Sequence, residues 1–503
     1  FYNTLIEMIF SRGRELLIQQ FSESRPFTTR TIYKRLGWYE EQGRFVYFHG
    51  TGAIASNGVV PHVEVEPLNE EFAPYALPAP PPWEQLPVIL TQVVQLTQVV
   101  KNAGYLLLAL VARAVLNEVY FADFMVYIIG TSGKFKTSLI LLLLMFFGDF
   151  KRKAPANWSD TPSALERKCH DAKDTLLLID EHTAHTAEGR KDLLTKSARI
   201  TMNIGNAASR SRVKSNLELQ DSYSPRGFST CTGEEMPCGL SAIARTLIVR
   251  TEHHRVNVNA LTAAQTVASR GIYRLFMAAY VQWLAPQIKP LKDCFPQQVE
   301  SWRAKLQGSH PRHAEKLGNL MAGLEVMQRF FNDVSHHTGQ PVQLDLNEAE
   351  RQLRLIVDHQ EVLLSEQDDC ERFLSLLVKV FAEGTAHLEL KIEQDPRPAY
   401  LVKFGWECDD KSKLIPEGPS IGYVDADQIY LNGVAAYGAV RRQAAREGCA
   451  LDVPKETLLT RMREKGLIHS TQDGKKTRNS HRRMIRGKYD RWICIDIATL
   501  YPD

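Results

Sequence analysis

The chain has 503 residues, of which 44% are hydrophobic and 24% charged, and its formal net charge is +3. A single hydrophobic core stops growing at roughly 250 to 300 residues, so this length predicts several domains. The near-neutral charge excludes a protein that is basic throughout, so any nucleic-acid signal has to be local. The longest apolar run, residues 139–147, falls short of the roughly 20 residues that cross a bilayer, and we expect no membrane partner.

The eight cysteines form no CxxC pair and lack the spacing of a zinc module or a disulfide framework. This pattern predicts reduced thiols in a cytoplasmic protein. The chain begins with Phe1 rather than Met, and its opening segment lacks the layout of a signal peptide, so we expect a fragment of a longer protein.

Composition and periodicity predict a multidomain α/β protein with four parts. Residues 1–85 suggest a small α+β domain that ends at a proline-rich hinge. Residues 86–256 alternate helical periodicity with continuous apolar runs, as in a parallel sheet covered by helices on both faces. Residues 257–390 have helical periodicity, and residues 391–503 combine a linker with a winged-helix-like basic domain. The expected buried strands are 124–129, 175–179, 227–231 and 246–249.

A glycine-containing loop follows the first of these strands, in the segment FMVYIIGTSGKFKTSL at residues 124–139. Strand, loop and helix follow in the order of a phosphate-binding loop, whose backbone N–H groups and helix N-terminus bind phosphate. This predicts ATP and Mg²⁺ as cofactors, with Lys136 on the β- and γ-phosphates and Thr137 on the metal. The predicted nucleotide-binding residues are Gly130, Thr131, Ser132, Gly133, Lys134, Phe135, Lys136, Thr137 and Ser138.

The loop departs from the GxxxxGK[ST] pattern at one position, because Phe135 stands where the second glycine is expected. Lys134 therefore remains an alternative to Lys136, although only Lys136 directly precedes a hydroxyl residue. A glycine-rich turn before a helix is also often purely structural.

The second chemical element is an apolar strand that ends in Asp180 and Glu181, about 40 residues after the loop. Asp180 is expected to hold Mg²⁺ through water, and Glu181 to orient and deprotonate the attacking water. Two carboxylates at a strand end can also simply face solvent. Their distance behind the loop favours the catalytic interpretation.

Further candidates lie on the strands that follow. Thr232 is expected to contact the γ-phosphate or the attacking water, with Thr230 as the alternative. Arg245 is expected to stabilise the transition state in its own subunit or in a neighbouring one, as arginines commonly do in phosphoryl transfer. Arg210 and Arg212 are alternatives for that role and are equally candidates for DNA contact. His182 and His185 form an HxxH pair, for which a loop position is favoured over a metal site.

The C-terminal segment has the order helix, helix, hairpin of a winged-helix module. Between Lys475 and Arg491 there are eight Lys or Arg residues and one acidic residue, Asp490. Such a local excess is typical of contact with a phosphate backbone, although many charge runs are only solvated surfaces. The predicted DNA-binding residues here are Lys475, Lys476, Arg478, Arg482, Arg483, Arg486 and Lys488, and Arg461 and Arg463 are candidates for a groove.

These residues together resemble a family of helicase-like ATPases found in phages, plasmids and integrative elements, often near primase-polymerase domains. The resemblance includes LGWYEEQGRFVYFHGTGAI, GTSGKFKTSL, NWSDTPSALE, PRGFSTCTGEEMP and IGYVDADQIYLN. The family's loop carries the same Phe before its Lys, which accounts for Phe135. The resemblance implies a RecA/AAA+ type core, related to replicative helicases of the MCM or superfamily III kind, and a homo-oligomeric, hexameric ring.

The leading functional hypothesis is therefore an ATP-dependent DNA helicase or translocase of a mobile genetic element, acting on single-stranded or forked DNA. A primase-polymerase is an expected partner through the resemblance. One alternative is an ATP-regulated DNA-binding replication initiator. Another is a defence or signalling ATPase that oligomerises on a protein partner.

Overall fold

The structure is a computed structural model that describes residues 31–501 except 67–68, 152, 185, 209–222, 238–239, 306–310, 367, 392–397, 409–412, 447–450, 452 and 474–475. The chain divides into two compact units, one up to Glu361 and the other from Val362 onward. The finer division into four domains stays a prediction.

The first unit is built around a sheet of five parallel strands in the order β11-β7-β10-β9-β8. All four apolar runs that we expected to be strands lie in it, which confirms the multidomain α/β class with a parallel sheet flanked by helices. Strand β8 was not predicted, because a strand of two residues leaves no periodicity in the sequence. The strands are β7 Met125–Ile129, β8 Ala156–Asn157, β9 Leu176–His182, β10 Phe228–Gly233 and β11 Thr246–Arg250.

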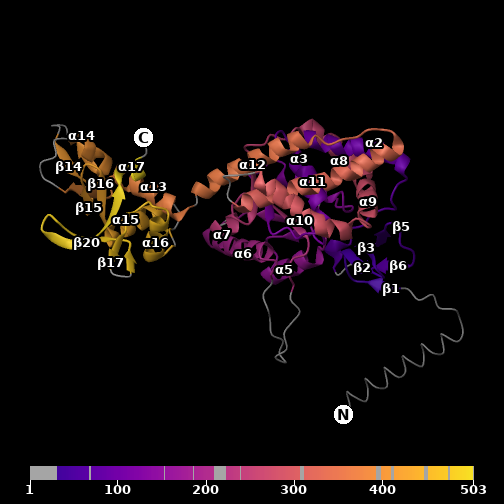
Figure 1. Ribbon diagram of the computed structural model, residues 1–503, viewed down its shortest axis with the longest axis horizontal. Helices are drawn as coiled ribbons and strands as arrows, with labels where there is room; N and C mark the ends of the chain where they lie inside the picture. Colours follow the sequence, from indigo (N-terminus) through magenta and orange to yellow (C-terminus); the bar gives the residue numbers. More distant parts are fainter. Residues whose placement is uncertain are drawn as a thin grey trace, which may run out of the picture. The chain divides into compact units, whose positions relative to one another are not determined.

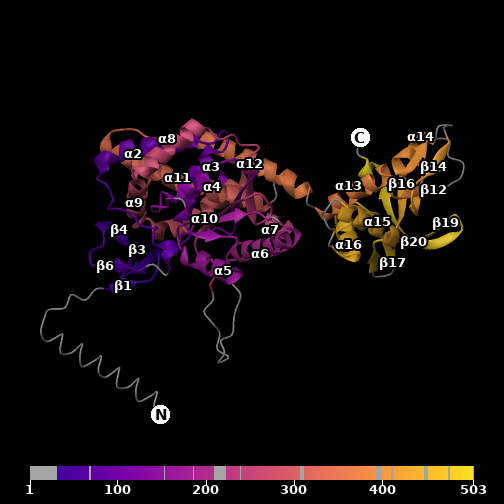
Figure 2. The same cartoon turned by 180° about the vertical axis from the view of Figure 1, so that it is seen from behind.

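Helices cover both faces of this sheet. Right-handed crossovers place the helix after β7 on one face and the helices of the three later connections on the other, because the strand order reverses after β8. The contacts agree: α4 packs on β9 and β10, whereas α6 packs on β7 and touches α5 and α7. Both views show α5, α6 and α7 together (Figures 1 and 2). These helices are α4 Lys136–Leu144, α5 Pro162–Asp171, α6 Ala187–Gly205 and α7 Leu240–Ile243.

Further helices pack around this core. Within the region predicted to be helical, residues 258–284 form two helices, because Gly271 between them has φ +78°. Helix α3 is fully buried and packs on α11. The helices are α2 Leu86–Val94, α3 Gly104–Ala114, α8 Val258–Ser269, α9 Ile272–Leu284, α10 Ile288–Ala304, α11 Pro311–Thr338 and α12 Leu346–Glu366, with short 3-10 turns at Glu70–Phe72, Trp83–Gln85 and Gln95–Gln98.

The N-terminal strands pack against the amino end of the central sheet. An antiparallel sheet has the order β2-β3-β4-β5, and β1 pairs with β6. The Trp38 indole donates a hydrogen bond to Val115 O at 2.8 Å, and the Tyr47 hydroxyl donates to Asp174 O at 3.0 Å. The strands are β1 Thr31–Tyr33, β2 Gly37–Glu41, β3 Arg44–His49, β4 Gly52–Ala55, β5 Gly58–Val59 and β6 Val63–Val65.

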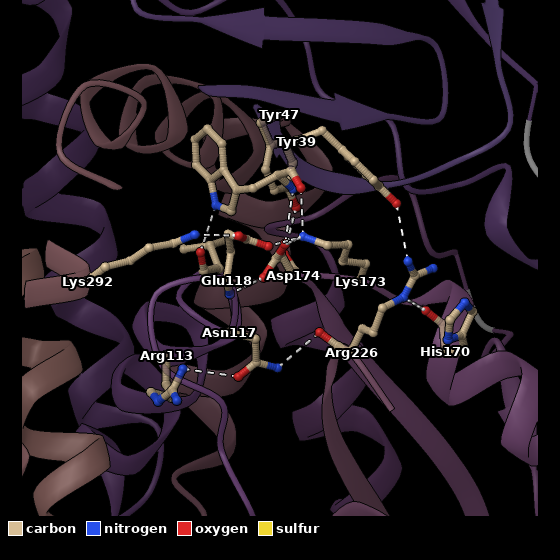
Figure 3. A network of polar contacts seen from close by, with 12 residues as sticks. Tyr39, Tyr47, Arg113, Asn117, Glu118, His170, Lys173, Asp174, Arg226 and Lys292 are labelled. Atoms are coloured by element: carbon tan, nitrogen blue, oxygen red, sulfur yellow. Dashed lines mark hydrogen bonds and ion pairs between the residues drawn. The ribbon is translucent and has the colours of Figure 1, made fainter. Parts of the chain in front are cut away.

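A buried polar network joins these two sheets (Figure 3). Lys173 donates to Glu118 at 2.7 Å and to Asp174 at 2.5 Å, and Lys292 donates to Glu118 at 2.6 Å. Burial opposes the charge of Lys173, but the two carboxylates outweigh it, so its pKa is raised. Every charge at the centre of this network therefore has a partner, as a buried charge requires.

The second unit holds a five-stranded sheet in the order β12-β15-β16-β20-β19, with its larger apolar core formed mainly with α13, α15 and α16. Helices α15 and α16 are followed by two hairpins, β17–β18 and β19–β20, which agrees with the predicted order of two helices before a hairpin. The assignment as a winged helix stays a prediction. The strands are β12 His387–Leu390, β13 Trp406–Cys408, β14 Leu414–Pro416, β15 Ser420–Val424, β16 Gln428–Asn432, β17 Thr471–Asp473, β18 Lys476–Arg478, β19 His481–Ile485 and β20 Lys488–Asp496. The helices are α13 Asp369–Ala382, α14 Pro398–Leu401, α15 Gly433–Arg446, α16 Lys455–Glu464 and α17 Ile497–Leu500, with a 3-10 turn at Val402–Phe404.

Within the described residues, none of the helices combines the length and the apolar character needed to span a membrane. The six cysteines that the structure describes are all free thiols, and four of them are buried.

Candidate nucleotide site

The predicted loop connects the carboxyl end of β7 to the first turn of α4. The Lys136 ammonium lies within the loop and donates to Gly130 O at 2.7 Å and to Thr131 O at 2.8 Å. Gly130 has no room for a side chain, because a Cβ there would lie 1.9 Å from Thr251 Oγ1. The loop therefore passes close to the end of β11 and leads directly into a helix N-terminus, where phosphate binds favourably.

Phe135 adopts the conformation that a glycine would normally supply. Its φ is +61°, in the left-handed region, and its side chain is 41% exposed. A non-glycine residue pays of order 1 kcal/mol or more for this conformation. Phe135 therefore replaces the glycine of the common loop pattern but keeps the left-handed backbone conformation that a glycine favours.

The two acidic residues lie at the carboxyl end of β9, beside the loop. Asp180 Oδ1 accepts a hydrogen bond from Thr137 Oγ1 at 3.0 Å and another from Thr232 Oγ1. One carboxylate and one hydroxyl are an oxygen set that suits Mg²⁺, which usually takes one or two carboxylates and completes its shell with water and phosphate oxygens. The residues present thus fit the metal that the sequence predicts.

Glu181 is held in place from a strand that the sequence analysis missed. Asn157, in β8, donates from Nδ2 to Glu181 Oε2 at 3.1 Å. Glu181 itself has φ +68°, and its backbone N–H donates to Asp180 Oδ1 at 2.9 Å. The register of β9 and β10 shifts at the same place, between Cys231 and Gly233. This local strain turns Glu181 away from the regular strand, and its side chain is exposed.

The strand order explains why Thr232 reaches the site. Because β10 lies between β7 and β9, its carboxyl end lies between the loop and the acids. The alternative residue, Thr230, is buried in the sheet, where its hydroxyl donates to Leu177 O at 3.1 Å. Of the two threonines, the structure brings Thr232 to the acidic pair.

An open cleft adjoins the loop on the side of β11. It is lined by Lys134, Phe135, His254 and Arg255 among others and has a volume of about 390 Å³. A second cleft of about 650 Å³ shares Arg255 and Val256 with it and extends to Gln98, Asn102 and Gln352. Burial lowers the pKa of His254 to about 4, so the ring is neutral at pH 7. The sequence places these residues directly after the apolar run 246–249, but only the pairing of β11 with β7 brings them to the loop.

Arg245 lies at the other end of the sheet. It precedes Thr246, which pairs with Met125 at the start of β7, whereas the loop follows Ile129. At roughly 3.3 Å per residue, the intervening strand spans about 16 Å. The guanidinium donates to Asn206 Oδ1 at 2.9 Å and to Ser241 Oγ at 2.7 Å. The structure therefore does not bring Arg245 to the loop of its own chain.

The histidine pair has no metal-site geometry within the described part of the chain. His182 is buried and its Nδ1 is 2.8 Å from Glu235 O, while burial lowers its pKa to about 4. His185 lies outside the described residues. Among the residues that are described, no group of three or more His, Cys, Asp or Glu side chains is arranged to hold a metal ion.

The predicted DNA-binding residues differ in their exposure and in their protein partners, and three of them lie outside the described residues. Arg482 is exposed on β19, Arg483 Nη1 donates to the Tyr430 hydroxyl at 3.4 Å, and Arg486, in the β19–β20 turn, lies 3.4 Å from Glu389. Arg478 lies in β18. The backbones of Lys476 and Lys488 are placed at strand starts, and Arg210, Arg212 and Lys475 lie outside the described residues.

The two arginines of α16 already have protein partners. Arg461 Nη1 lies 2.5 Å from Asp369, and Arg463 Nη1 donates to Asn479 at 2.8 Å. For either arginine, contact with a DNA groove would have to compete with these bonds.

Comparison with known proteins supports the fold. The sequence matches no family model and no curated protein. Among solved structures, the chain is similar to the active helicase Cch of SCCmec type IV, with a TM-score of 0.55 and 13% identity, over 98% of this chain and 87% of that one. It also aligns with the NrS-1 C-terminal region, with a TM-score of 0.33 and 10% identity, over 96% of this chain and 90% of that one. The alignment with a JCV helicase has a TM-score of 0.27 and 14% identity, over 47% of this chain and 66% of that one. The last two scores are too low to carry weight, so what is shown is that this chain shares its fold with the Cch helicase.

Proposed function

We propose that the chain is an ATP-hydrolysing motor of a mobile genetic element that works as a DNA helicase or translocase and assembles into a ring, with six subunits as the expected number. The observation that carries the proposal is the meeting of Thr137, Asp180 and Thr232 at one carboxylate oxygen beside a loop that ends in a helix N-terminus. The fold shared with the Cch helicase adds weight.

The residues divide the work as follows. Lys136 and the backbone N–H groups of the loop bind the phosphates. Thr137 and Asp180 would hold Mg²⁺, which would supply positive charge against the negative charge of the phosphates. Asn157 holds Glu181, whose carboxylate accepts the proton of the water that attacks the γ-phosphorus, while the bond from this phosphorus to the bridging oxygen breaks and ADP leaves. Thr232 orients that water or the γ-phosphate.

Two further assignments belong to this proposal. The clefts on the β11 side accommodate the nucleoside, since they are the open space next to the phosphate loop. Arg245 acts on the site of a neighbouring subunit, because its position at the amino end of β11 separates it from its own loop.

The test is the rate of ATP hydrolysis with and without single-stranded DNA, together with strand displacement on a forked substrate. We expect DNA to raise the rate and ATP to drive displacement, and the Glu181→Gln variant to lose both. Hydrolysis that DNA leaves unchanged, without displacement, would exclude a helicase. Site-specific DNA binding by residues 420–503 within the chain, without movement, would instead support an initiator.

A further inference from the structure

Within the described part of its unit, the β19–β20 hairpin has one face whose side chains are exposed. A two-residue turn joins the strands, with φ +48° at Arg486 and +73° at Gly487, as in the tightest hairpins. In the register of the two strands, Arg482 pairs with Arg491 and Met484 with Tyr489. Side chains alternate between the faces of a strand, so these four share one face.

The other face of the hairpin is the one that packs on the protein. Ile485 and Trp492 are each 2% exposed and form a buried cluster with Tyr430 and Cys494. The Trp492 indole also donates to Arg483 O at 3.2 Å. The face that carries Met484 and Tyr489 is therefore the outer one, and these two side chains are 68% and 59% exposed.

The outer face carries positive charge together with apolar surface. The Arg482 guanidinium carbon lies 4.7 Å from the centre of the Tyr489 ring, and Arg491 is exposed beside it. The acidic neighbour, Asp490, belongs to the opposite face, where it accepts from Asn432 Nδ2 at 3.4 Å. Among the described residues, neither Arg482 nor Arg491 has a carboxylate partner. The face thus offers two cations, an aromatic ring and a methionine, without an anion of its own.

We propose that this outer face binds unpaired bases of single-stranded DNA. Tyr489 stacks on a base through the part of its ring that Arg482 leaves exposed, Met484 packs beside it, and Arg482 and Arg491 contact the flanking phosphates. Stacking on an aromatic ring needs a free base face, which a duplex hides, and cations next to the ring match the phosphates on either side of a base. The choice of DNA as the polymer rests on the proposed function.

The experiment measures the affinity of the full chain for a fluorescent oligothymidylate, for an oligonucleotide of equal length with abasic sites, and for a duplex. Tyr489→Ala is expected to weaken binding to oligothymidylate roughly tenfold and to leave binding to the abasic strand and the duplex unchanged. Tyr489→Phe, which keeps the ring, is expected to bind like the parent chain, and Met484→Ala to lose a few-fold. Val434→Ala, which removes another exposed apolar side chain of this unit, is the control.

The proposal is overturned if Tyr489→Ala binds oligothymidylate as tightly as the parent chain, or if it loses affinity for the abasic strand to the same degree. Tighter binding to RNA of the same length, or to vesicles with anionic headgroups, would assign the face to another ligand. The experiment distinguishes failure of this proposal from failure of the proposed motor. If DNA does not change the rate of hydrolysis but oligothymidylate binding still depends on Tyr489, the chain is not a DNA-driven motor, and the outer face still binds single-stranded DNA.

Discussion

The two ends of the central sheet use similar polar residues in opposite ways. At the amino end, Lys173, Asp174 and Glu118 are buried or half-buried and satisfy one another (Figure 3). At the carboxyl end, Glu181 and the loop before Lys136 are exposed, and Phe135 and Glu181 have positive φ. The polar groups at the amino end join two sheets. The carboxyl end leaves them accessible to a ligand and holds them in a strained backbone, which is typical of functional sites.

The largest effect is expected from Lys136→Ala, which should reduce ATP hydrolysis to background because the phosphates lose the ammonium held at the loop. Phosphate release measures it. Lys134→Ala is the matched control and should retain most of the activity. If Lys134→Ala loses activity and Lys136→Ala retains it, Lys134 is the lysine that binds the phosphates.

Arg245→Ala should lower the hydrolysis rate by about 10³-fold and leave nucleotide binding intact, since an arginine of this kind acts on the transition state. The exposed Arg270→Ala is the control. Mixing Arg245→Ala with Lys136→Ala subunits should restore activity, because a Lys136→Ala subunit still supplies Arg245 to its neighbour. If mixtures stay inactive, Arg245 does not act between subunits, and the amino end of the sheet has no part in the chemistry.

Glu181→Gln should slow hydrolysis by about 100-fold or more while nucleotide affinity stays near that of the parent chain, because the amide cannot accept the proton of the water. Single-turnover rates and nucleotide titration separate the two effects. Asn157→Ala, which removes only the group that holds Glu181, should slow the reaction less. Normal turnover by Glu181→Gln would contradict the role of this carboxylate.

At the amino end, Lys173→Met should lower the free energy of unfolding by about 3 to 5 kcal/mol, because Asp174 and Glu118 lose their buried cation. Chemical denaturation measures this change. The exposed Lys289→Met should stay within about 0.5 kcal/mol of the parent chain. The rate of hydrolysis per folded molecule should not change, and a loss there would show that the two ends are not separate in function.

The smallest effect concerns pH. Burial lowers the pKa of His49, His182 and His254 to about 4, below the usual 6.5. Between these values the unfolded chain binds more protons than the folded one, so stability falls as the pH is lowered from 6.5 towards 4. The melting temperature should drop by roughly 5 °C or more from pH 7.5 to pH 5. His49→Gln should reduce that drop, and an unchanged drop would mean that His49 contributes nothing to it.

The sequence by itself determined the elements whose signal is local. Continuous apolar runs predicted the four longer strands of the central sheet, and the glycines between a strand and an apolar helix placed the loop before Lys136. The carboxylates after an apolar run identified Asp180 and Glu181 as the end of a strand. These features depend on neighbours within a few residues, where backbone preference and side-chain period dominate.

Only the tertiary structure decided which of these residues meet. The order β11-β7-β10-β9-β8 pairs strands that lie far apart in the chain, and it is this order that brings Thr232 to Asp180 and separates Arg245 from the loop. The support of Glu181 by Asn157 comes from a two-residue strand without a periodic signal. The exposed face at Tyr489 likewise followed from strand register, since a shift by one residue would have turned it inward. Pairing between strands that are distant in the chain sets the positions at the central sheet, and the packing of Trp492 with Tyr430 sets which face of the β19–β20 hairpin is buried. Local composition encodes neither.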